Sequence, residues 1–130
     1  VHIFKIATAL DAGRVINMKM AEGQLLGGVV QGLGSAISEG YKYTDEGVLK
    51  NPSFTDYKIP TCNDIPDEIV PIFIENPEAH GPYGARGLAE HPMISVPSVI
   101  GNALFDATGI DSFNLPLSPE NILLLIKENE

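Results

Sequence analysis

The sequence predicts an α+β fold, a mixed sheet with helices packed against it. Residues 2–10 and 69–75 alternate apolar and polar side chains and are rich in β-branched and aromatic types, as strands are. Residues 18–39 instead repeat apolar side chains at the spacing of a helix. The predicted order is strand, helix, hairpin, strand, helix, helix, which favours α+β. The 130 residues suffice for one domain, residues 1–130.

The first strand is expected to end at a turn over residues 11–14, where Gly13 supplies a permissive backbone. Asn17 is expected to cap the next helix. The apolar positions of that helix are Met20, Leu25, Val29, Val30, Leu33 and Ile37. Five glycines interrupt it, at positions 23, 27, 28, 32 and 34. Each costs up to about 1 kcal/mol relative to alanine, which predicts close packing against another backbone or a bulky ligand.

The second half of the chain begins with a predicted hairpin around Asp45-Glu46-Gly47. Residues 51–66 contain three prolines and are expected to form an ordered loop, and residues 76–89 form a Gly- and Pro-rich loop after the second strand.

Two helices are expected after that loop. One runs from about His91 to Ala107, starts late or bends at Pro97, and ends at Gly109. The last begins with Ser118 as its cap and runs to about Lys127.

Composition excludes several classes of partner. The net charge is −9, from 8 basic and 17 acidic residues, and no cluster of Lys and Arg occurs. We therefore expect neither nucleic acid nor an anionic membrane as a partner. No apolar stretch approaches the roughly 18 residues of a membrane span. Cys62 is the only cysteine, which fits a reducing cytoplasm, and we expect it to be an unreactive thiol.

The histidines do not predict a metal site, and the start of the chain predicts a fragment. His2, His80 and His91 lie far apart and lack the spacing of metal ligands, so no metal-ligating residue is predicted. The chain opens with Val1 inside an apolar run, as the middle of a sheet would. We therefore expect it to be a piece of a longer protein.

Chemistry is concentrated in the stretch 81–92, where a Gly-rich loop delivers Glu90 just before a helix. A carboxylate placed in this way can act as a general base if a substrate proton lies within reach. Alternatively, Glu90 only complements the helix N-terminus, a contribution of about 0.3–1 kcal/mol. A phosphate-binding loop is a third reading, but neither of its glycine motifs is present. The residues alone leave the first two readings open.

Residues 84–92 read Gly-Ala-Arg-Gly-Leu-Ala-Glu-His-Pro, which resembles the Gly-Ala-x-Gly-x-Gly-Glu-x-Pro segment of the molybdenum hydroxylases. This is the xanthine dehydrogenase and aldehyde oxidase family. The resemblance implies that Glu90 is the catalytic base beside the molybdenum. Ala89 stands where the family usually has Gly, and we expect it to lie at the cofactor.

Two further segments are similar to the same family. Residues 11–17 resemble its Asp-x-Gly-x-x-x-Asn turn, although Met18 follows where the family usually has Pro. Residues 23–34 resemble its Gly-Gln-x-x-Gly-Gly-x-x-Gln-Gly-x-Gly helix, which implies that Gln24 contacts the pterin cofactor. The loop 56–66 matches a segment that we expect to be structural. The resemblance covers about residues 3–126, and residues 115–120 resemble the family's closing segment, so we expect a natural C-terminus.

The resemblance implies a C-terminal part of a longer molybdopterin-binding subunit. The expected reaction is hydroxylation of an aldehyde or an N-heteroaromatic, purine-like small molecule with water-derived oxygen. The expected cofactor is molybdopterin, the molybdenum cofactor, and iron-sulfur clusters and FAD would lie on other domains or subunits. Expected partners are those domains and the remainder of the subunit, and the chain alone would be inactive. The alternative is a non-catalytic structural or assembly domain of the same fold.

For several other residues near the glutamate, the sequence leaves both a functional and a structural role open. Arg86 would meet an anionic substrate or the cofactor phosphate, or simply lie on the surface. His80 and His91 would touch substrate or be structural. Tyr83 would line the pocket or pack, and Gln31 would hydrogen-bond near the cofactor or pack in its helix.

Overall fold

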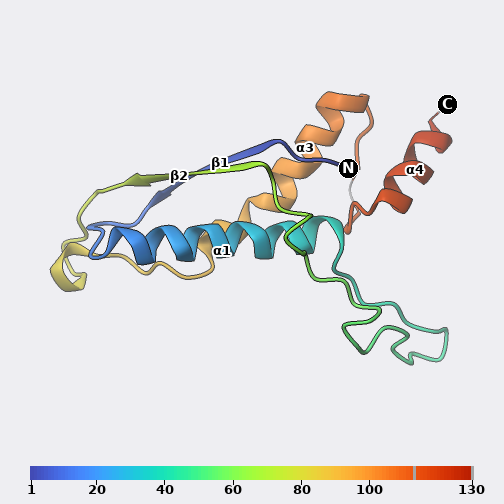
Figure 1. The fold of residues 1–130 in the computed structure, drawn as a ribbon, viewed down its shortest axis with the longest axis horizontal. Coiled ribbons are helices and arrows are strands. Elements are labelled where there is room, and N and C mark those ends of the chain that lie inside the picture. Colours follow the sequence, from blue (N-terminus) through green and yellow to red (C-terminus); the bar gives the residue numbers. More distant parts are fainter. Residues whose placement is uncertain (113, 130) are drawn as a thin grey trace.

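A computed structural model describes residues 1–112 and 114–129, and it has the predicted α+β architecture (Figure 1). The elements in order are β1 (Lys5–Asp11), α1 (Met18–Ile37), β2 (Glu68–Ile74), the short 3-10 helix η1 (Pro82–Gly84), α2 (His91–Ile94), α3 (Val96–Thr108) and α4 (Pro119–Glu128).

The sheet pairs β1 with β2 in parallel, from Lys5 opposite Glu68 to Asp11 opposite Ile74. Within the part of the chain that the structure describes, the sheet has these two strands alone. The expected hairpin does not extend it into a mixed sheet. That hairpin is reduced to one antiparallel bridge between Tyr43 and Leu49, because its segment extends from the far end of α1, away from the strands (Figure 1).

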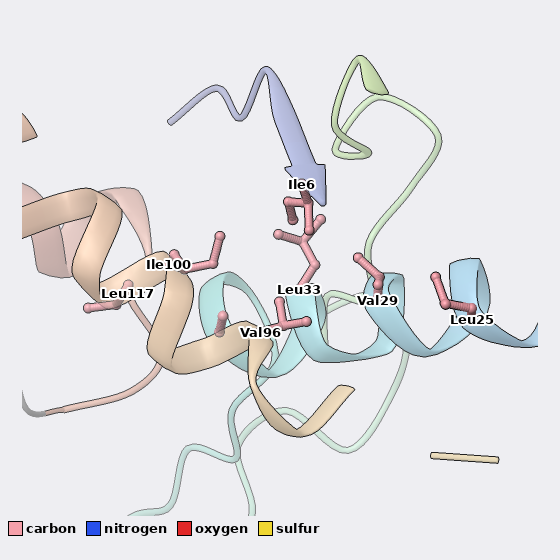
Figure 2. Packing of buried hydrophobic residues seen from close by; sticks show 8 residues of the cluster. Ile6, Leu25, Val29, Leu33, Val96, Ile100 and Leu117 are labelled. Atoms are coloured by element: carbon pink, nitrogen blue, oxygen red, sulfur yellow. The ribbon is translucent and has the colours of Figure 1, made fainter. Parts of the chain in front are cut away.

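Helix α1 forms the centre of the core. Asn17 caps it as predicted, since its side-chain oxygen accepts a hydrogen bond from the Met20 N–H at 3.1 Å. One face of α1 packs against β1 and α3, as Figure 2 shows; the residues in this cluster include Ile6, Leu25, Val29, Leu33, Val96, Ile100 and Leu117. Burial of each such aliphatic side chain contributes about 1.5–3 kcal/mol.

Three of the five α1 glycines have the close packing that the sequence predicts. A Cβ on Gly28 would lie 2.9 Å from Pro92, and one on Gly32 would lie 2.7 Å from Val96. Gly34 is crowded by the Glu39 and Pro60 side chains. Helices α2 and α3 thus cross α1 at positions where only glycine fits. Gly23 and Gly27 have no atom within 4 Å of such a Cβ in the structure as described.

The predicted helix over 91–107 is divided at Ser95 into α2 and α3. Pro97 lies in the first turn of α3. Because proline has no N–H, it cannot donate the helical hydrogen bond to the carbonyl four residues earlier, in α2. The helix ends at Gly109 as predicted, with left-handed backbone (φ 72°). Ser118 caps α4, since its hydroxyl accepts a hydrogen bond from the Asn121 N–H at 3.2 Å. In residues 1–112 and 114–129, no helix is long and apolar enough to cross a membrane.

Candidate active site at the carboxyl ends of the strands

Both strands end at the same edge of the sheet, and α1 begins there (Figure 1). The loop after β2, residues 75–90, turns back at this edge before it enters α2. Ligands of parallel sheets commonly bind outside the carboxyl ends of the strands. This edge is therefore where a binding site is expected. The loop turns there and then runs back along α1 to Glu90 (Figure 1).

The turn between β1 and α1 holds this loop through backbone contacts. Gly13 forms an antiparallel bridge with Ala85. The Arg14 N–H donates to the Gly84 carbonyl at 2.8 Å, and the Arg86 N–H donates to the Ala12 carbonyl at 3.0 Å. Gly13 has a φ of 63°, and a Cβ there would lie 2.5 Å from the Gly84 oxygen. Only glycine allows the turn and the loop to approach so closely.

A second contact holds the loop to α1. The Gln24 side chain donates from Nε2 to the Ala89 carbonyl at 3.0 Å. Glu90 follows Ala89 directly and is exposed. The structure thus brings the three predicted site residues together from two segments that are far apart in the sequence.

Glu90 does not cap the helix that it precedes. It occupies the N-cap position of α2 with helical backbone (φ −95°, ψ 0°), and its side chain makes no capping hydrogen bond. Helix α2 is also only four residues long. Among the residues that the structure describes, no ion pair involves Glu90. The alternative, a charge that complements the helix N-terminus, is thus left with a helix of only four residues and no capping hydrogen bond.

Two cavities flank the loop. The first, of about 350 Å³, is lined by the start of α1 and by the loop, including Arg14, Met20, Gln24 and Leu88. The second, of about 540 Å³, is lined by polar groups that include Asp11, Glu78, His80 and His91. Ala85 and Arg86 line both cavities.

Arg86 lies between two carboxylates. Its Nε is 3.7 Å from Asp11 Oδ1, and one terminal nitrogen is 3.5 Å from Glu78 Oε2. Asp11 also accepts a hydrogen bond from the Gly13 N–H at 3.0 Å. This hydrogen bond, together with the Arg86 charge, lowers the pKa of Asp11 below its usual value. Asp11 and Glu78 are the contacts that sequence reasoning missed, because nothing in the motifs pairs them with Arg86.

The other candidate site residues lie in different surroundings. His80 and His91 both line the second cavity, so they lie beside the loop as expected. Tyr83 does not pack: its side chain is 85% exposed, and its φ of 56° is unusual for a residue other than glycine. Gln31 is exposed on α1. Among the residues described, no group of three or more His, Cys, Asp or Glu side chains could hold a metal ion.

Comparison with known protein families shows which family the chain belongs to. Residues 1–66, about half of the chain, match the family model of the molybdopterin cofactor-binding domain. The chain belongs to this family. The resemblance to the molybdopterin-binding subunits of the molybdenum hydroxylases is thereby confirmed.

Relatives and solved structures agree with this assignment. The domain is 38% identical over 123 residues, 94% of its length, to a putative xanthine dehydrogenase molybdenum-binding subunit of Escherichia coli (strain K12). It is 34% identical over 117 residues, 90% of its length, to an aldehyde oxidoreductase of Megalodesulfovibrio gigas. The crystal structure of quinoline 2-oxidoreductase from Pseudomonas putida 86 superposes with a TM-score of 0.90 at 32% identity, over 98% of this molybdopterin-binding domain.

The molybdopterin-binding domain spans only part of each of these proteins. It covers 16% of the xanthine dehydrogenase subunit, 12% of the aldehyde oxidoreductase and 16% of the quinoline 2-oxidoreductase chain. Their activities belong to molecules several times longer.

Proposed function

We propose that this molybdopterin-binding domain forms part of a molybdenum hydroxylase in which Glu90 is the general base. The enzyme would add a water-derived oxygen to an aldehyde or to an N-heteroaromatic, purine-like small molecule. The observation that carries the proposal is the position of Glu90. Its exposed carboxylate directly follows Ala89, the residue whose carbonyl Gln24 of α1 anchors.

The groups around the first cavity suit molybdopterin. The Gln24 amide offers a donor and an acceptor, which a pterin ring can match. The Arg14 guanidinium lines the same cavity and is suited to a phosphate. Gln24 and Ala89 are therefore the residues of this chain that we assign to the cofactor. When bound, molybdopterin supplies the centre that takes up the two electrons of the oxidation.

The protein's own part in the reaction is proton transfer and placement. Glu90 accepts a proton at a carboxylate oxygen as the new carbon–oxygen bond forms in the substrate. Gln24 holds the Ala89 carbonyl and so fixes the position of the backbone from which the Glu90 side chain extends. His80 and His91 line the second cavity, beside the loop that leads to Glu90.

The rest of the reaction depends on parts of the enzyme beyond these residues. We infer that the remainder of the subunit completes the pocket, and that iron-sulfur clusters and FAD on other domains or subunits carry the electrons away. Relatives named for xanthine, aldehyde and nicotine oxidation support an enzyme of this class. The lone exposed Cys62 supports a cytoplasmic location.

The test is Glu90→Gln in the full-length subunit, produced together with its partner subunits. Glutamine keeps the size of the side chain but cannot accept the proton, so turnover with an artificial dye acceptor should fall by about 10²–10⁴-fold. Molybdenum content and melting temperature should stay as in the wild type. Glu68→Gln, at the opposite end of the sheet, is the matched control and should retain full turnover.

Two results would contradict the proposal. Retention of more than about a tenth of wild-type turnover would remove Glu90 from the base role, because the loss would fall below the general-base range. Loss of turnover together with molybdenum or solubility would make Glu90 a structural residue and would favour a non-catalytic assembly domain.

A further inference from the structure

Three separate segments meet at the Arg86 side chain. Asp11 is the last residue of β1, and Glu78 lies near the start of the loop after β2. Arg86 lies in the part of that loop that leads to Glu90. The side chains of all three are about one-third exposed, at 33–38%. Asp11 is itself fixed by the Gly13 N–H, so the guanidinium is directed at a carboxylate whose position is already set.

The loop that leads to Glu90 is therefore held at two points. At the first, the Arg86 N–H binds the Ala12 carbonyl while the Arg86 side chain lies between Asp11 and Glu78. At the second, Gln24 binds the Ala89 carbonyl. Only residues 87 and 88 separate the two points. Movement at Arg86 would consequently be passed along a very short span to Glu90.

We propose that Arg86 is a positioning residue for Glu90, which it holds in place through its contacts with Asp11 and Glu78. This inference rests on the proposed function of Glu90. Arg86 does not touch the reacting atoms in this role. It links its own part of the loop to Asp11 at the end of β1 and to Glu78 at the start of the loop. A planar guanidinium can pair with two carboxylates at once, whereas a lysine ammonium is a point charge without that geometry.

The expected effect is on rate rather than on folding. Partly exposed ion pairs of this kind contribute little to global stability. Displacement of a reacting group by about 1 Å, in contrast, can reduce the rate by about 10²-fold. Loss of the contacts of Arg86 with Asp11 and Glu78 should therefore lower kcat and leave the melting temperature nearly unchanged.

The experiment compares variants of the full-length enzyme with its partner subunits. Arg86→Ala should lower kcat by about ten- to hundredfold, with KM, molybdenum content and melting temperature unchanged. Arg86→Lys should lose less, since it keeps the charge. Asp11→Asn should lower kcat in the same direction, and in combination with Arg86→Ala it should add little, because residues of one network are not additive. Lys5→Ala removes a different strand-end ion pair, with Glu68, and should leave kcat unchanged.

Each other outcome overturns the proposal in a recognisable way. A rise in KM with unchanged kcat would mean that Arg86 binds substrate, and loss of molybdenum would mean that it binds the cofactor. Unchanged kcat in Arg86→Ala, beside an inactive Glu90→Gln, would refute the positioning role alone. An active Glu90→Gln would refute the proposed function and the positioning role with it. If Arg86→Ala fails to fold, Arg86→Lys and Asp11→Asn carry the test.

Discussion

At the scale of single residues, Glu90 is placed by the backbone contacts of its neighbours. The Ala89 carbonyl is held by Gln24, and the backbone at Gly84 and Arg86 is held by the turn around Gly13. The Glu90 side chain makes no capping bond in the structure as described. A carboxylate left free in this way remains available to a substrate, and its position depends on residues that carry no chemistry themselves.

Gly13→Ala tests this dependence. The new Cβ would lie 2.5 Å from the Gly84 oxygen and 2.9 Å from the Arg86 nitrogen, at a φ of 63°. The turn and the loop must separate, so we expect lower turnover of the full-length enzyme and a loss of stability of about 2–3 kcal/mol or more.

Gly47→Ala is the matched control, because Gly47 has a φ of 80° but has nothing within 4 Å of a new Cβ in the described structure. It should cost only the backbone strain, about 1–2 kcal/mol, and should leave turnover unchanged. Assays of dye-linked activity and melting temperature measure both effects. Equal turnover in the two variants would contradict a role for the Gly13 contact in the site.

At the scale of elements, the crossing of α1 with α2 and α3 links the core to the site. Gly28 and Gly32 allow Pro92 and Val96 to approach the α1 backbone. Pro92 lies two residues after Glu90 and is buried. The same packing that closes the core thus sets the start of α2, where Glu90 lies.

Gly32→Ala should move these helices apart. Its Cβ would lie 2.7 Å from Val96 Cβ and 2.8 Å from the Met93 carbonyl oxygen, and overpacking of this kind costs about 1–3 kcal/mol. The melting temperature of the full-length subunit should fall, and turnover should fall with it because α2 shifts.

The control for this prediction is Gly101→Ala in α3, where a Cβ meets nothing within 4 Å in the described structure. Alanine is the better helix former, by up to about 1 kcal/mol, so the melting temperature should stay level or rise. A Gly32→Ala variant as stable as Gly101→Ala would mean that the helices do not meet at Gly32.

At the scale of the whole molecule, large apolar side chains remain exposed on several elements. Met20 of α1 is 73% exposed, and Phe54 in the loop before β2 is 79% exposed. The sheet, with two strands, leaves Ile72 and Ile74 half-exposed. These surfaces fit a chain that covers only 16% of the xanthine dehydrogenase molybdenum-binding subunit to which it is 38% identical.

The chain produced alone should therefore contain no molybdopterin and show no turnover. Its own cofactor contacts are few: Gln24 and Arg14, which line the first cavity, and Ala89, whose carbonyl Gln24 holds. The cost of ordering a bound group must be met by many contacts. Metal analysis of the purified chain, beside the full-length subunit from the same cells, measures this. Stoichiometric molybdenum in the isolated chain would refute the prediction.

Features that depend on local interactions could be predicted from the sequence alone. Asn17 and Ser118 cap helices through bonds to N–H groups three residues away, and Gly109 ends α3 through its own backbone conformation. Each can be recognised from residue type and position because both partners lie within one turn. The motif around Glu90 was recognisable for a similar reason, since its residues are consecutive.

Which distant segments meet, in contrast, follows from the packing of the whole fold. Sequence patterns did not show that the predicted hairpin stays outside the sheet, that Gly28 and Gly32 pack while Gly23 and Gly27 do not, or that Arg86 lies between Asp11 and Glu78. Helical spacing places all these glycines on a helix but does not say which face another helix will cover. That choice depends on the total packing of β1, α1 and α3, which no single segment encodes.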